Sequence, residues 1–182
     1  MEPNPKNAEK KRMGNLPKSL DKDVSGVLNN IRRFDRSLPM SLLKAHEAVL
    51  RTFIPHLRVR DLSTQQWRVM RALAESEALD LSELSDACSL LRPSISRIVQ
   101  NLEARGIIER GPCARDSRRS LVTITEKGLH LITEIAPESE ARYDYIESRF
   151  GADNLAQLYR LLHSLEEALD NPASDSSVAD DQ

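Results

Sequence analysis

The chain has 182 residues, 40% of them hydrophobic, and a formal net charge of −2. This length and composition fit one compact domain with a substantial core. The chain has neither an apolar run of about 18 residues, enough to span a bilayer, nor a signal-peptide pattern. We therefore expect a cytoplasmic protein with no membrane partner.

Motifs for catalysis or metal binding are missing from the sequence. It contains no phosphate-binding glycine loop, no HExxH and no nucleophile elbow, and its four histidines are scattered. Cys88 and Cys113 fit neither a disulfide framework nor a zinc spacing. We predict that the chain is not an enzyme and needs no cofactor or metal.

The N-terminal part changes character along its length. Residues 1–20 are basic with few apolar positions and are predicted to form a disordered arm, while 21–34 have the pattern of an extra amphipathic helix. Pro39–Leu57 then carries a long apolar stripe at helical spacing. Ser63 is predicted to cap the next helix, with Gln66 as its capping-box partner.

Two short helices separated by a turn follow. Ser82–Cys88 has helical spacing with Ser82 placed to cap it, Ser89–Arg92 forms the turn, and Pro93 suits the first position of the second helix. Gly106 is predicted to end that helix. Its apolar stripe is Ile95, Ile98, Val99 and Leu102.

The opposite face of the second helix is polar and suited to contacts with phosphates or base edges. A solvated surface helix would explain the same residues. The predicted DNA-contacting side chains on this face are Ser94, Ser96, Arg97, Gln100 and Asn101.

A basic hairpin is predicted next. Gly106–Arg110 and Leu121–Thr125 have strand patterns, and the turn between them adds Arg115, Arg118 and Arg119 as DNA contacts. From Arg92 to Lys127 the chain has eight Arg or Lys against four Asp or Glu, a net charge of +4. A local basic patch on an acidic chain indicates an anionic partner, and arginines in a hairpin can enter a minor groove.

The C-terminal part is predicted to be helical. After the hairpin comes a long helix disturbed at Pro137, then a last helix over Asn154–Leu169 whose apolar stripe is too wide for one neighbour. This excess apolar surface favours a homodimer, although packing against the first long helix is the alternative. Residues 172–182 are predicted to form an acidic, flexible tail.

These elements predict a mainly α fold with a small β-hairpin wing. A winged helix-turn-helix lobe is flanked by N- and C-terminal helices, and the whole domain covers 21–171. The lobe is expected at about 61–127, and the flanking helices at about 21–58 and 128–170.

The segments LSDACSLLRPSISRIVQNLEARGIIER and ARDSRRSLVTITEKG resemble the DNA-binding lobe of the MarR (multiple antibiotic resistance regulator) family. The wing pattern of that family matches Asp116, Arg118, Ile124 and Thr125. Upstream, LPMSLLKAHEAVLRTFIPHL and LSTQQWRVMRALAES resemble the subgroup that controls homoprotocatechuate and related aromatic-acid degradation. The resemblance covers residues 38–169, and it departs from the subgroup at His46, where Arg is usual.

This resemblance implies a repressor of an aromatic-acid catabolic operon in which the helices at about 21–58 and 128–170 are dimerisation helices. The dimer would bind a palindromic double-stranded DNA operator and be released by a small aromatic carboxylate. The ligand would lie between the first long helix and the DNA-binding lobe. A carboxylate needs a cation or hydroxyl donor and an aromatic ring needs a flat apolar wall. The candidate ligand contacts are Ser41, His46, Trp67 and Arg92.

Other readings of the same residues remain open. The fold could serve an activator, and Cys113 at the base of the wing could make the regulator redox-responsive. In a different class, the chain could be a helical protein-interaction module whose basic hairpin docks an acidic partner without binding DNA.

Overall fold

The computed structural model describes residues 31–112 and 120–170. Several expectations lie outside these residues: the arm, most of the helix predicted over 21–34, the acidic tail, and Cys113, Arg115, Asp116, Arg118 and Arg119. The chain divides into two compact units, 1–46 and 47–182, and the division falls within the first long helix. Each unit is described by itself.

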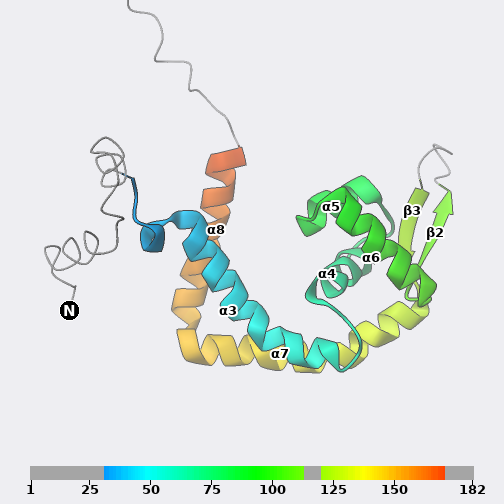
Figure 1. Cartoon of the computed structure of the whole chain (residues 1–182). Coiled ribbons are helices and arrows are strands. Elements are labelled where there is room, and N and C mark those ends of the chain that lie inside the picture. The colour runs from blue at the N-terminus through cyan, green and yellow to red at the C-terminus, as the bar shows by residue number, and fades with distance from the viewer. Residues whose placement is uncertain (1–30, 113–119, 171–182) are drawn as a thin grey trace, which may run out of the picture. The chain divides into compact units, whose positions relative to one another are not determined.

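The described chain is mainly helical with one small antiparallel sheet, which confirms the predicted fold class (Figure 1). In chain order its elements are η1 (Phe34–Arg36), α3 (Leu38–Arg58), α4 (Thr64–Ala74), β1 (Leu79–Asp80), α5 (Leu81–Cys88), α6 (Arg92–Ala104), β2 (Ile108–Pro112), β3 (Ser120–Ile124), α7 (Glu126–Phe150) and α8 (Ala152–Asp170). The first unit contains η1 and the part of α3 up to His46. The rest of α3, from Glu47, and all later elements belong to the second unit.

The sheet has the strand order β1-β3-β2, and all neighbours are antiparallel. The predicted hairpin corresponds to β2 and β3, which pair from Ile108 opposite Ile124 to Pro112 opposite Ser120. The strand β1 was not predicted, because it has two residues and exists only by pairing Leu79 with Val122, far along the chain.

Local signals fix most helix ends. The capping box of α4 is present as predicted: Ser63 Oγ accepts from the backbone N–H of Gln66, and Gln66 Oε1 accepts from that of Ser63. The cap predicted for Ser82 is wrong, since Asp80 caps α5 and accepts from the backbone of Ser82 and Glu83. The α6 helix ends at Ala104, and Gly106 follows it with φ +67°, as a C-terminal glycine should.

The core lies in the second unit, where α4, α5 and α6 pack together against the sheet. The predicted apolar stripe of α6 is buried within it. Cys88 is also buried, and burial raises the pKa of its thiol, so it is a small core side chain rather than a reactive one. The buried hydrophobic residues are Phe53, Leu57, Leu62, Val69, Met70, Leu73, Leu84, Cys88, Ile95, Ile98, Val99, Leu102, Ile107, Ile108, Val122 and Ile135.

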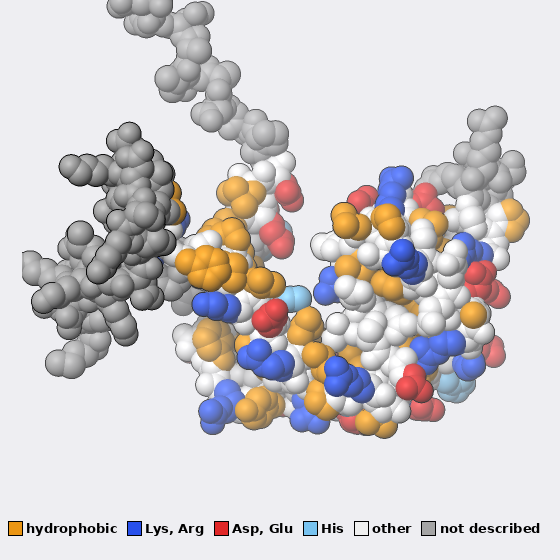
Figure 2. Space-filling model, in the orientation of Figure 1, with side chains coloured by type: hydrophobic (Ala, Val, Ile, Leu, Met, Phe, Trp, Pro, Cys, Tyr) orange, Lys and Arg blue, Asp and Glu red, His pale blue; other side chains and the backbone are white. Residues whose placement is uncertain are grey.

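The last helix has no buried residue, although its sequence is rich in leucine. Large hydrophobic side chains, including Leu158, Tyr159, Leu161 and Leu169, are exposed along α8, and Figure 2 shows hydrophobic side chains on its visible surface. Among the described helices none is both long and apolar enough to cross a membrane.

Candidate DNA-binding and effector sites

The turn between α5 and α6 fixes how α6 is presented. Ser89 adopts a left-handed conformation with φ +48°, which ends α5, and the backbone N–H of Leu90 donates to Ser85 O at 3.0 Å. Arg68 Nη1 on α4 donates to Cys88 O at 2.8 Å, so the same turn is anchored from a third helix. The segment therefore has the helix-turn-helix arrangement that the spacing predicted.

The predicted DNA-contacting face of α6 is divided by burial. Arg97, Gln100 and Asn101 are exposed, whereas Ser94 and Ser96 are half-buried. Arg97 makes no hydrogen bond or ion pair within the part of the chain that the structure describes. Arg97 and Gln100 are thus available for a ligand. Asn101 is engaged, because its Oδ1 accepts from Gln66 Nε2 at 2.7 Å.

Three of the cations between Arg92 and Lys127 make polar contacts inside the second unit. Arg110 Nε pairs with Glu103 at 2.9 Å, and Lys127 Nζ donates to Arg105 O at 2.6 Å. Arg105, the C-terminal cap of α6, donates to Asp61 O at 2.9 Å and to Arg60 O at 3.2 Å. Arg105, Arg110 and Lys127 are thus engaged within the unit, and Arg92 and Arg97 are the exposed cations on α6.

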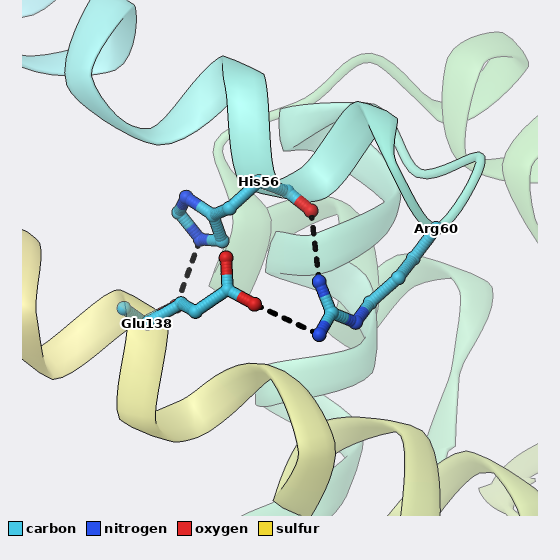
Figure 3. A network of polar contacts seen from close by, with 4 residues as sticks. His56, Arg60 and Glu138 are labelled. Carbon is cyan, nitrogen blue, oxygen red and sulfur yellow. Dashed lines mark hydrogen bonds and ion pairs between the residues drawn. The ribbon is translucent and has the colours of Figure 1, made fainter.

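A polar network joins the end of α3 to α7 (Figure 3). His56 is buried, and its Nε2 lies 3.1 Å from Ser139 Oγ. Arg60 Nη2 pairs with Glu138 Oε1 at 2.8 Å, and its Nη1 donates to His56 O at 3.3 Å. Through Arg60 O, which accepts from Arg105, this network is continuous with the C-terminal end of α6.

Burial lowers the pKa of His56, because a desolvated imidazolium is disfavoured. The negative charge of Glu138 opposes this shift, and the positive charges of Arg142 and Arg60 add to it. The buried Nδ1 of His56 has no hydrogen-bond partner within the described chain. Sequence reasoning missed this network. The available signal was the spacing of His56, three residues after Phe53 and next to Leu57, which places it on the buried side of α3.

The four predicted ligand contacts fall in both units. In the first, Ser41 and His46 are exposed on α3, and Ser41 Oγ donates to Ser37 O at 3.1 Å. In the second, Trp67 is half-buried on α4. Arg92 is exposed at the start of α6 and donates to Ser82 Oγ on α5. Among the described residues, Arg92 and Trp67 are not joined by a hydrogen bond or a cation–π contact.

Arg71 is a cation that the sequence analysis overlooked. Its guanidinium carbon lies 6.0 Å from the centre of the Trp67 ring, and its Nη2 pairs with Glu75 at 2.7 Å. The spacing of four residues between Trp67 and Arg71 on one helix could have indicated it, because such residues share a helix face. A flat apolar ring and a guanidinium are therefore neighbours on α4.

Comparisons with known proteins point to one family. A model of the MarR family matches residues 60–119. The chain is 36% identical over 129 residues to the HTH-type transcriptional regulator FarR of Neisseria gonorrhoeae, covering 71% of this chain and 88% of that protein. It is 35% identical over 126 residues to the homoprotocatechuate degradative operon repressor of Escherichia coli, covering 69% and 85% respectively.

A solved structure is also similar to this chain. NadR in complex with 4-hydroxyphenylacetate superposes with a TM-score of 0.67 at 34% identity, covering 74% of this chain and 98% of NadR. The relatives named here are regulators of transcription and not enzymes. The chain belongs to the MarR family of winged helix-turn-helix transcription regulators.

Proposed function

We propose that the chain is a dimeric repressor that binds a palindromic operator of an aromatic-acid catabolic operon and leaves it when a small aromatic carboxylate binds. The observation that carries the DNA-binding part is the exposure of Arg97 and Gln100 on α6, whose opposite face is fixed in the core. Since its target is chromosomal DNA, we place the protein in the cytoplasm.

In this mechanism α6 of each subunit enters the major groove, and two subunits reach successive grooves. Arg97 and Gln100 would read base edges, because guanidinium and amide groups match the donor and acceptor pattern of guanine and adenine. Ser94 and Ser96 near the start of α6 would donate to phosphates. The hairpin of β2 and β3 would carry Arg115, Arg118 and Arg119 to the adjacent minor groove.

The dimer is proposed from the exposed hydrophobic side chains of α8. A helix with leucines and no buried residue leaves an apolar surface that a monomer would expose to water. A second copy is the occupant we favour, because a two-fold dimer matches a palindromic operator.

The effector class is proposed from similarity and from side-chain chemistry. One relative is named for homoprotocatechuate degradation, and a similar structure holds 4-hydroxyphenylacetate. Trp67 offers a flat wall and Arg71 beside it offers a cation, while Ser41, His46 and Arg92 remain candidate polar contacts. Binding would favour a spacing of the two lobes that no longer fits the operator, which is a shift of population between two states.

The test is a fluorescence anisotropy titration with the DNA upstream of the protein's own gene and with a scrambled duplex of equal length. We expect tighter binding to the upstream DNA. Aromatic acids such as 4-hydroxyphenylacetate are then added, with acetate as the carboxylate without a ring and tyramine as the ring without a carboxylate. An acid of the right class raises both the apparent Kd for DNA and the Tm of the protein. The effector proposal is wrong if no aromatic acid does both, and the DNA proposal is wrong if the two duplexes bind alike.

A further inference from the structure

The orientation of the Asn101 amide is fixed by a neighbouring helix. Asn101 lies on α6, and α4 and α6 lie side by side (Figure 1). Its Oδ1 accepts a hydrogen bond from Gln66 Nε2 on α4 at 2.7 Å. Its Nδ2 makes no hydrogen bond within the described part of the chain, and the side chain is exposed.

Which end of each amide faces its partner follows from a group that can only donate. The backbone N–H of Ser63 lies 2.8 Å from the side-chain oxygen of Gln66, and a backbone N–H is never an acceptor. Gln66 must therefore present its Oε1 to Ser63 and its Nε2 to Asn101. Asn101 in turn must present its Oδ1 to Gln66, which leaves its NH₂ group as the available end.

We infer that Gln66 is a positioning residue for DNA binding, which holds the Asn101 amide so that its NH₂ group donates to a DNA phosphate oxygen. This inference rests on the proposed function, in which α6 lies in the major groove. Phosphate oxygens only accept hydrogen bonds, so an amide turned the other way would present a repelling carbonyl oxygen. Asn101 sits on the side of α6 nearest α4, at the edge of the face formed by Arg97 and Gln100, where a backbone contact is expected rather than a base contact.

The capping box permits a sharp test, because glutamate replaces glutamine in it without loss. In a Gln66→Glu variant the carboxylate still accepts from Ser63, and its charge suits the N-terminus of α4. The carboxylate has no hydrogen to give to Asn101, however, so the amide turns its NH₂ group inward and its Oδ1 toward the DNA. We expect DNA binding to weaken about tenfold, the usual scale for one hydrogen bond to a charged group, with no fall in Tm.

The added negative charge needs a matched control. Gln65 is exposed and is the preceding residue of α4, so Gln65→Glu adds the same charge beside the same helix terminus. Gln65→Glu is expected to weaken binding only slightly, which sets the size of the charge effect. Binding by Gln66→Glu equal to that of Gln65→Glu would overturn the inference.

A double-mutant cycle isolates the bond between the two amides. Asn101→Ala alone should weaken binding about as much as Gln66→Glu. The double variant should bind only slightly more weakly than Asn101→Ala, by the charge effect that Gln65→Glu measures. Fully additive losses would overturn the inference.

The kind of DNA contact is tested with Asn101→Ala. A phosphate contact predicts equal relative losses of affinity for the upstream and scrambled duplexes. The slope of binding against salt should stay unchanged, since a neutral amide releases no counterion. A loss confined to the upstream duplex would overturn the phosphate contact and make Asn101 a base-reading residue.

Wild-type controls separate this inference from the proposed function. If the wild-type chain binds neither duplex, both are wrong. If it binds the upstream DNA while Gln66→Glu and Asn101→Ala behave independently, the positioning role alone is wrong.

Discussion

Arg60 Nη2 lies 2.8 Å from Glu138 Oε1, and this ion pair joins the chain just after α3 to the middle of α7. The same guanidinium donates to His56 O, while Ser139, the residue after Glu138, contacts the His56 ring. Arg60 O also accepts from Arg105 at the end of α6. The end of α3 is therefore bonded both to α7 and to the end of the proposed recognition helix.

The ion pair itself is expected to stabilise the fold only weakly. Both side chains keep some contact with water, so we expect Glu138→Ala to lower the free energy of unfolding by less than about 1 kcal/mol. Urea denaturation measures this change, with exposed Glu140→Ala on the same helix as the control. A loss several times larger would mean that Glu138 supports the network in a way beyond its charge.

Acidification should destabilise the protein through His56. The pKa of His56 is lowered, chiefly by burial, so the folded chain keeps a neutral imidazole where the unfolded chain binds a proton. The contribution of His56 to the free energy of unfolding is therefore constant above the usual histidine pKa of about 6.5. It falls as the pH drops below that value. Urea denaturation between about pH 5.5 and 8, which spans that range, should show this fall.

A glutamine at position 56 keeps an amide near Ser139 but does not titrate in this range. We expect His56→Gln to be less dependent on pH than the wild type. His163→Gln is the matched control, because His163 is exposed on α8. Identical pH profiles for the wild type and His56→Gln would exclude a contribution from His56.

Gly128 is required by close packing rather than by its backbone conformation. A Cβ atom at this position would lie 2.3 Å from Ile107 O and 2.6 Å from Ile124 Cγ1. Because a backbone carbonyl must move, we expect Gly128→Ala to destabilise the fold by about 1–3 kcal/mol, the range for overpacking. Gly111→Ala, where a Cβ meets nothing within 4 Å, is the control and should change the Tm little.

The proposed dimer depends on the apolar surface of α8. Leu161 is 60% exposed, and Leu161→Glu should shift the protein to monomers, since a buried unpaired carboxylate opposes association. Sedimentation velocity measures the change. Ala156→Glu adds the same charge on another side of α8, beside Arg160, and should leave the dimer intact. A dimer that survives Leu161→Glu would place the interface elsewhere.

Arg97 and Arg118 should affect DNA binding differently. Loss of a base-reading guanidinium, as in Arg97→Ala, should reduce discrimination between operator and scrambled DNA by about 1–3 kcal/mol. Loss of a phosphate-binding or groove-binding charge, as in Arg118→Ala, should weaken binding to operator and scrambled DNA alike. It should also lower the slope of log affinity against log salt concentration by about one. Anisotropy titrations at several salt concentrations separate the two, and an unchanged affinity for Arg118→Ala would remove the wing from the interface.

Signals that lie close together in the chain predicted much of the fold. The capping box of Ser63 and Gln66, the buried stripe of α6 and the glycine that follows it could be read directly, because helix periodicity and caps involve residues within a few positions. The cap of α5 was misassigned because Ser82 and Asp80 are both good capping residues, and the choice depends on where β1 pairs. The family was recognisable for the same reason, since its motifs are continuous segments.

What the sequence by itself determined, then, is the order of the elements, the winged helix-turn-helix lobe and the family to which the chain belongs. Which polar groups are already engaged was decided only by the tertiary structure. Arg105 and Arg110 were counted in the basic stretch, but Arg105 donates to the backbone O of Asp61, Arg110 pairs with Glu103, and Asn101 is held by Gln66. His56 meets Ser139 across 83 positions of sequence. A hydrogen bond needs its two atoms within a few tenths of an ångström of an ideal distance, and for residues so far apart only the packing of helices on one core sets that distance.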